Sequence, residues 1–321
     1  MNSRTFSYAQ LSQSDVSILI ERLVKAIEKT NKPAYEISKV PTICDQVLET
    51  KLSKYMAYVP QMVNLFSNDY PYAYSEHLQA FLQACRDIGL ERGPFGLTCL
   101  NDDESGYLDI YRTMNVLVQQ IRLITKSKNY KRAKDDRKYQ AKLNEQQVDR
   151  YTNLMLDRYS RTVVVRVDLF YREAARARLR VEEVFEHVDS LMRLRRTNSI
   201  FEYEIGYICS IEQGEKKGFH VHAAFFFNGA HVRSDWKKGR DIGELWACIT
   251  NGKGHFHSCN DDKAAYGEEL GIGTIYRSDE DARGNVLRAM AYLTKDSQHL
   301  RIKPEGGRTL RMGQRLNLAL V

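Results

Sequence analysis

Two histidines separated by one residue, His220 and His222, are the side chains best placed to carry chemistry. Side chains alternate between faces in an extended strand, so both imidazoles would share one face while their apolar neighbours occupy the other. The stretch 200–211 is also rich in β-branched and aromatic residues, and residues 214–218 have the composition of a hairpin loop. These segments predict a β-hairpin that carries both histidines.

The length of this loop places a carboxylate beside the histidines. If residues 214–218 form the loop, Glu212 falls opposite His220 on the same face, with Cβ atoms about 5 Å apart. A slip of one residue would turn Glu212 away, and the alternative is that the histidines form a half-exposed surface pair. Two imidazoles and one carboxylate suit a divalent ion and leave coordination positions open for a substrate oxygen. The set predicts a metal site of Glu212, His220 and His222.

A tyrosine on a basic helix is the second chemical feature. Residues 278–281 form a capping-box pattern with acids in the first turn of the expected helix. Helical winding groups the apolar side chains on one side and Tyr292 with two cations on the other. The apolar residues are Val286, Leu287, Met290 and Leu293, and the cations are Arg288 and Lys295. Cations at these spacings can steer a phosphate to the tyrosine hydroxyl, although an exposed tyrosine on a basic helix is the alternative.

The order of these motifs resembles a known superfamily. A carboxylate, then His-hydrophobic-His, then Tyr-x-x-Lys is similar to the HUH endonucleases that initiate rolling-circle replication, here Glu212, His220 with His222, and Tyr292 with Lys295. Within that superfamily, roughly residues 155 to 315 resemble the replication initiators of filamentous phages (inoviruses) and their prophage relatives. Histidines that precede the tyrosine resemble the arrangement of the replication initiators, and a single tyrosine, with Lys295 where some initiators carry a second one, is similar to their one-tyrosine class.

The resemblance implies a function. It implies metal-dependent, site-specific nicking and joining of single-stranded DNA through a 5′-phosphotyrosyl intermediate, which initiates rolling-circle replication of a phage, prophage or plasmid. Tyr292 would be the nucleophile, Lys295 would neutralise charge or position it, and Mg²⁺ or Mn²⁺ would be the cofactor. The three metal-binding residues taken alone would suit zinc equally. Expected partners are single-stranded origin DNA, with or without a hairpin, and the host helicase and polymerase, because the sequence has no phosphate-loop motif.

Positive charge favours a polyanionic partner. The net charge is +7, and residues 126–150 are strongly charged and poor in apolar residues. This stretch predicts either a solvated helix or a contact to the DNA backbone through Lys131, Arg132 and Lys134, with Tyr130 and Tyr139 able to stack on bases. Arg166 and Asp168 share a face of an expected strand and are candidates for the wall of the active site, with Arg166 also a candidate DNA contact. Asp168 could equally be an acid satisfied by a local donor.

A second His-x-His, His255 and His257, offers a competing site. Together with Cys248 it could bind a structural zinc ion. Ala247 stands where the first motif has its carboxylate, and Gly252 and Gly254 indicate a loop that is solvated or close to DNA. Two other classes of function therefore stay open: a non-cleaving DNA-binding regulator derived from an initiator, and a structural-metal protein.

Length and composition predict a two-domain α+β protein. The chain has 321 residues, of which 43% are hydrophobic. We expect a mostly helical region over 1–125, with helices near 14–32, 77–90 and 107–125, and a charged helical linker over 126–155. Residues 156–321 should form the HUH endonuclease domain, a central antiparallel sheet flanked by helices.

The expected elements of the second domain follow the order β-α-β-β-α-α-β. The predicted ranges are a strand at 163–171, a helix at 173–196, the hairpin, a helix at 234–249, the tyrosine helix and a strand at 308–312. No Cys-x-x-Cys spacing, signal peptide or membrane-length apolar run is present, so a cytoplasmic protein of a bacterial host cell is expected.

Overall fold

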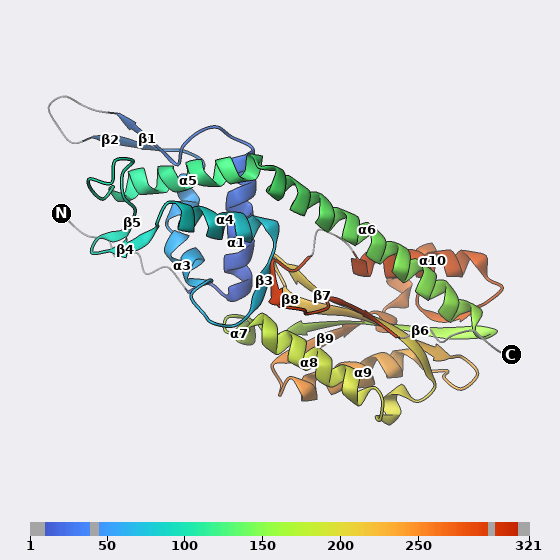
Figure 1. Cartoon of the computed structure of the whole chain (residues 1–321). Helices are drawn as coiled ribbons and strands as arrows, with labels where there is room; N and C mark the ends of the chain where they lie inside the picture. The colour runs from blue at the N-terminus through green and yellow to red at the C-terminus, as the bar shows by residue number, and fades with distance from the viewer. Residues whose placement is uncertain (1–9, 39–44, 295–298, 314–321) are drawn as a thin grey trace. The chain divides into compact units, whose positions relative to one another are not determined.

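The computed structural model describes residues 10–38, 45–294 and 299–313, and these divide into two compact units. Unit 1 comprises Met1–Asp136 and Arg301–Glu305, and unit 2 comprises Arg137–Leu300 and Gly306–Val321. The long helix α6 (Lys128–Asp157) begins in unit 1 and continues in unit 2 (Figure 1). It covers most of the range predicted as a charged linker. Nowhere in the described ranges is a helix both long and apolar enough to cross a membrane.

Unit 1 is built on three packed helices. Helices α1 (Gln13–Glu28), α4 (Glu76–Asp87) and α5 (Ile110–Lys126) contact one another and confirm the helices predicted there. Their apolar faces bury side chains such as Leu23, Phe81 and Leu117, which are inaccessible to solvent. The other elements are α2 (Ser53–Met56), α3 (Val59–Asn64) and three antiparallel strand pairs: β1 (Tyr35–Ser38) with β2 (Gln46–Glu49), β3 (Tyr72–Tyr74) with β11 (Ile302–Pro304), and β4 (Glu91–Gly93) with β5 (Gly96–Thr98).

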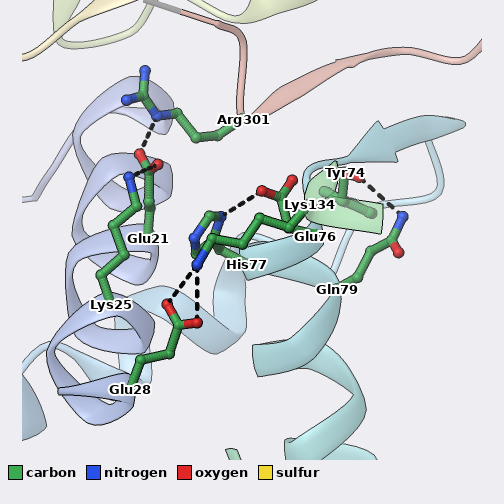
Figure 2. Close-up of polar contacts among 9 residues, drawn as sticks. All are labelled: Glu21, Lys25, Glu28, Tyr74, Glu76, His77, Gln79, Lys134 and Arg301. Carbon is green, nitrogen blue, oxygen red and sulfur yellow. Dashed lines mark hydrogen bonds and ion pairs between the residues drawn. The ribbon is translucent and has the colours of Figure 1, made fainter. Parts of the chain in front are cut away.

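Unit 1 also contains a cluster of buried ionisable side chains (Figure 2). The Glu21 carboxylate lies 2.5 Å from both Arg301 Nε and Lys25 Nζ. His77 is fully buried, with its Nδ1 3.3 Å from Glu76 Oε1. Burial lowers the pKa of His77 to about 4, so its ring is neutral at physiological pH.

Unit 2 is organised around a six-stranded antiparallel sheet. The strand order is β10-β6-β8-β7-β12, and β9 pairs with β6 as well. The bounds are β6 (Arg161–Tyr171), β7 (Glu204–Gly214), β8 (Gly218–Asn228), β9 (Gly254–Ser258), β10 (Gly273–Tyr276) and β12 (Leu310–Met312). The helices are α7 (Glu173–Arg176), α8 (Val181–Leu194), α9 (Asp235–Ile249) and α10 (Glu280–Ala291), with short 3-10 turns η1 (Ser199–Phe201), η2 (Cys259–Asp261), η3 (Lys263–Glu269) and η4 (Tyr292–Thr294). The predicted α+β class with an antiparallel central sheet is confirmed.

Three predictions about elements of unit 2 were wrong. The helix predicted over 173–196 is two helices, because Arg180 takes an extended conformation and caps α8. The predicted order lacks β9 and β10. His255 and His257 lie on strand β9 and not in a loop, and their backbone pairs with the second half of β6.

Helices cover both faces of this sheet. Figure 1 shows α8 and α9 on one side and α10 on the other. The buried side chains on the face toward α8 and α9 include Val165, Phe225 and Phe227. On the opposite face, Val164, Ile208 and Phe226 pack with residues of α6 and α10 in one apolar cluster. Further along the same strands this second face becomes polar, and the candidate site lies there.

Candidate metal centre and neighbouring tyrosine

The β7–β8 hairpin has the register that the sequence predicts. Glu212 pairs with His220, Gln213 with Phe219 and Gly214 with Gly218, so the connecting loop is residues 215–217. Gly218 has a φ of +63°, a left-handed conformation that favours glycine and closes the short loop. The pairing places Glu212, His220 and His222 on the polar face of the sheet.

Ligand atoms of these residues converge. His222 Nε2 lies 3.6 Å from Glu212 Oε2, and His220 Nε2 lies 3.9 Å from the same oxygen. One ligand atom from each residue falls within 4.8 Å of the others, and all three residues are at most 3% exposed. Atoms that bind one ion at about 2.1 Å are separated by about 3–4 Å, so small movements would close this set on a cation. The buried Glu/His/His group can therefore hold a metal ion.

The outer ring nitrogens orient both imidazoles. His222 Nδ1 lies 2.6 Å from Asp168 Oδ1, and His220 Nδ1 lies 3.0 Å from the carbonyl oxygen of Gly218. Each Nδ1 donates its hydrogen to an acceptor, which leaves the Nε2 lone pair directed toward Glu212. A carboxylate behind a histidine is the usual outer contact of a metal-binding imidazole.

Several buried atoms of the group lack the partner that a cation would supply. Neither carboxylate oxygen of Glu212 nor the Nε2 of His222 has a hydrogen-bond partner among the described residues. Burial, together with the charge of the nearby Asp168 carboxylate, raises the pKa of the Glu212 carboxyl to about 8. A divalent ion would offset the free-energy cost of ionising this buried carboxyl, because its positive charge neutralises the carboxylate. The residues present thus fit a bound metal ion.

Asp168 differs from Glu212 although both acids are buried. Burial alone would raise the pKa of Asp168, but the hydrogen bond from His222, with the charges of Arg166 and Lys217, holds it below its ordinary value. Asp168 is therefore an ionised acceptor for His222. The sequence left open that Asp168 is satisfied by a local donor. That donor is His222, one of the three candidate metal ligands.

Tyr292 lies beside this group. Its ring is edge-on to His222, with 5.7 Å between ring centroids, and Arg166 Cζ lies 4.9 Å from the tyrosine ring centroid. Helix α10 positions it: the helix is capped by the Asp279 side chain, which accepts from Ala282 N, and ends just before Tyr292 in η4. The cap is Asp279 and not Ser278 as the pattern suggested. Met290 and Leu293 are buried in the apolar cluster, whereas Tyr292 is half-buried.

The tyrosine also lines a basic pocket. It has a volume of about 600 Å³ and lies between α6 and α10. Its lining includes Tyr292, the cations Lys138, Lys142 and Arg288, and the acid Glu145. The predicted grouping of Arg288 with Tyr292 is therefore found. Lys295, the other predicted cation, lies outside the described residues.

The predicted DNA contacts at the start of α6 lie in unit 1 and are not all available. Tyr130 is only 5% exposed and packs edge-on against His77, so the prediction that it stacks on bases was wrong. Lys134 pairs with Glu28 at 3.1 Å. Lys131 and Arg132 are exposed, with Arg132 3.7 Å from Asp136.

The second His-x-His forms no metal site of its own. Within residues 10–38, 45–294 and 299–313, the one group of His, Cys, Asp or Glu side chains able to hold a metal ion is Glu212, His220 and His222. His255 and His257 are exposed on β9, opposite Phe170 and Asp168 of β6. This register puts them on the same sheet face as the candidate metal centre. In the sequence, the alternation of Arg166, Asp168 and Phe170 along β6 already indicated that this polar face continues to Phe170.

Comparison with known proteins gives one match. The family model described as the YagK/YfjJ C-terminal domain, a prophage-associated family, matches residues 122–251. The matched range is less than half of the chain; it contains Asp168, Glu212, His220 and His222 but ends before Tyr292. No curated protein and no solved structure matches the chain.

Proposed function

We propose that this protein is a metal-dependent, HUH-type DNA endonuclease and strand transferase. In this proposal it nicks and rejoins single-stranded origin DNA through a 5′-phosphotyrosyl intermediate and initiates rolling-circle replication of a phage, prophage or plasmid. The observation that carries the proposal is the placement of Tyr292 against His222, where a buried Glu/His/His group has unsatisfied atoms. The prophage-associated family match is compatible with this setting.

Tyr292 is the nucleophile of the proposed reaction. Its Oη forms a bond to phosphorus, and the bond from phosphorus to the 3′ oxygen breaks. The 3′ oxygen leaves with the bonding electron pair and takes up a proton, while the phenol loses one through solvent. The link on Tyr292 replaces one phosphodiester with another, so a 3′ hydroxyl can reverse the step and rejoin the strand.

The surrounding residues bind and orient the reacting groups. Arg166 lies over the Tyr292 ring, with Nη2 3.5 Å from Asp168, and its charge favours the developing phenolate. Asp168 holds His222 in one tautomer. Arg288, Lys138 and Lys142 line the pocket beside Tyr292 and can bind backbone phosphates. Lys295 keeps the charge-neutralising role that the resemblance implies.

Glu212, His220 and His222 would hold Mg²⁺ or Mn²⁺. When bound there, such an ion supplies Lewis-acid stabilisation of charge on the scissile phosphate. The oxygen and nitrogen donors also allow zinc, so metal identity belongs to the proposal.

Covalent capture tests the proposal. The protein is incubated with a library of single-stranded oligonucleotides and Mn²⁺, and DNA that stays attached after denaturation is sequenced. We expect one preferred sequence context with the wild-type protein. We expect no adduct with Tyr292→Phe, because the phenyl ring retains the packing but lacks the attacking oxygen.

The controls separate loss of chemistry from loss of binding. Tyr276→Phe changes an exposed tyrosine of β10 and should form adducts at the wild-type level. Tyr292→Phe should still bind the selected oligonucleotide and Mn²⁺. Adducts that persist in Tyr292→Phe would refute the assignment, and binding without any wild-type adduct would support the alternative, a non-cleaving DNA-binding regulator.

A further inference from the structure

The polar face of the sheet continues past the metal centre to its rim. The Phe170 ring stacks on His220, with 5.9 Å between centroids, and lies 5.3 Å from the His255 ring. Lys217 Nζ lies 4.5 Å from the Phe170 ring centroid. Phe170 is largely buried beneath them, whereas Lys217 and His255 are exposed. The rim thus presents the exposed ring of His255, supported by the buried Phe170 ring and edged by the Lys217 cation, and none of these three side chains is a candidate metal ligand.

Two arginines add positive charge to this rim. Arg172 Nε donates to the Gly252 carbonyl at 3.1 Å, and Arg176 Nη1 donates to the Lys216 carbonyl at 2.6 Å. Both guanidinium groups are therefore fixed beside the turn before β9 and the β7–β8 loop. The acids close to these residues in sequence are Glu173 of α7 and Glu215 of the β7–β8 loop, so cations remain in excess. Burial, with the charges of Arg172 and Arg176, lowers the pKa of His255, which keeps its ring neutral and suited to stacking.

The strand register places the rim and the tyrosine on opposite sides of the metal centre. Along β6 the residues on this face are Arg166, Asp168 and Phe170, and Asp168 pairs with His222 of β8. Tyr292 contacts Arg166 and His222 at one end. Phe170 contacts His220 at the other end. Because alternate residues of a strand are about 6.6 Å apart, the rim lies roughly 13 Å along β6 from Arg166.

The geometry of phosphoryl transfer gives these two ends different roles. Attacking and leaving oxygens lie roughly in line across the phosphorus. If Tyr292 attacks from its side of the metal centre, the 3′ oxygen and the nucleotide that carries it must lie on the opposite side, toward the rim. Aromatic platforms flanked by cations bind single strands, because bases stack on the rings and phosphates contact the cations.

We propose that Phe170, Arg172, Arg176, Lys217 and His255 form a subsite for the nucleotides on the 5′ side of the cut. It would hold the released strand with its 3′ hydroxyl facing the metal centre, ready to prime synthesis or to rejoin. This subsite rests on the proposed nicking function and adds a polarity to it: upstream DNA at the rim, and downstream DNA in the pocket of Lys138, Lys142 and Arg288.

The test combines protein variants with shortened substrates. Two oligonucleotides are made from the sequence recovered in the adduct selection, one complete and one lacking all but the first nucleotide on the 5′ side of the cut. We expect Lys217→Ala combined with His255→Ala to raise KM for adduct formation roughly tenfold on the complete oligonucleotide, a size typical of one lost stack and one lost phosphate contact. With the shortened oligonucleotide, the wild-type KM should also be raised roughly tenfold, and the KM of the double variant should equal that of the wild type.

Lys253→Ala is the matched control. It removes a lysine from the turn before β9. Lys253 Nζ lies 3.3 Å from Glu183 Oε1, so this lysine is already paired, and its loss should leave KM unchanged. Mn²⁺ affinity of the double variant should not fall more than about twofold below wild type, because neither side chain supplies a ligand atom and loss of the Lys217 charge, which acts on Glu212 and Asp168, favours a bound cation. The subsite would be overturned if the double variant raised KM equally on both oligonucleotides, or if its effect disappeared only when the 3′ side of the substrate was shortened. Either result would leave the proposed nicking function standing. Absence of any wild-type adduct would overturn both.

Discussion

Asp168 is the residue whose role the sequence alone left open. Its carboxylate accepts a hydrogen bond from His222 Nδ1 at 2.6 Å and lies 3.5 Å from Arg166 Nη2, so it joins the candidate metal centre to the cation above Tyr292. The sequence placed Asp168 on the correct face because strand alternation is regular. It could not show the pairing of β6 with β8, which depends on contacts between residues 54 positions apart.

Replacing this acid should weaken metal binding without unfolding the protein. In Asp168→Asn the amide keeps the shape but loses the charge that makes His222 a strong ligand. We expect Mn²⁺ affinity, measured by isothermal titration calorimetry, to fall roughly tenfold to a hundredfold. Asp241→Asn, at an acid of α9 that pairs with the exposed Lys237, is the control and should bind Mn²⁺ as the wild type does. An unchanged affinity in Asp168→Asn would show that the contact is structural only.

At the scale of elements, the β7–β8 hairpin could be predicted in detail and β9 could not. Two glycines bracket the hairpin loop, and its length fixes the register of Glu212 and His220. Gly254 suggested a loop, yet it lies in β9, where a Cβ would come within 2.5 Å of Trp246 Nε1. Glycine is required there by close packing against α9, and Gly252, with a φ of +74°, makes the actual turn. A single sequence does not distinguish these two uses of glycine.

Strand β11 returns to unit 1 after the tyrosine helix, and a buried ion pair accompanies it. Arg301 Nε lies 2.5 Å from Glu21 Oε2, with both side chains at most 7% exposed (Figure 2). Arg301→Met would leave the Glu21 carboxylate buried, with Lys25 still beside it. We expect the free energy of unfolding, measured in urea, to fall by about 2–3 kcal/mol. Arg240→Met, at an exposed pair with Asp261, should cost less than about 1 kcal/mol, and equal losses would contradict the role assigned to burial.

Helix α4 carries a second buried group with a consequence for pH. The pKa of His77 is lowered from 6.5 to about 4, mainly by burial, against the opposing charges of Glu76, Glu21 and Glu28. A group with a lowered folded-state pKa favours folding fully above the unfolded pKa, and this contribution is lost as the pH falls through about 4. Acidification from pH 7 to pH 4 should therefore remove about 3 kcal/mol of stability through His77. Urea titrations of His77→Gln at both pH values should show a smaller loss than wild type, and equal losses would refute the assignment.

At the scale of the whole molecule, the net charge of +7 predicts DNA binding that depends on salt. Lys138 and Lys142 line the pocket beside Tyr292 and are candidates for phosphate contacts. Replacing both with alanine should reduce the slope of log affinity for single-stranded DNA against log salt by about 1.4, because each lost phosphate contact on a single strand changes it by about 0.7. Fluorescence anisotropy with a labelled oligonucleotide over a KCl series measures this slope. Lys237→Ala, at an exposed lysine of α9, should leave it unchanged, and an unchanged slope in the double variant would exclude the pocket as a phosphate site.

The division into two units was only partly accessible from the sequence. The charged, apolar-poor stretch 126–150 predicted the long helix that both units share. The membership of residues 301–305 in unit 1 depends on the pairing of β11 with β3 and on Glu21, which precedes Arg301 by 280 residues. Such distant contacts leave no local pattern in a single chain.

The measurement that bears most directly on the central claim is mass spectrometry of the covalent adduct. After nuclease digestion and proteolysis, we expect the peptide that contains Tyr292 to carry a residual nucleotide, joined through its 5′ phosphate to the phenolic oxygen, only when Mn²⁺ or Mg²⁺ was present. A nucleotide attached to any other residue, or an adduct that forms unchanged in Glu212→Gln with a chelator present, would contradict the account.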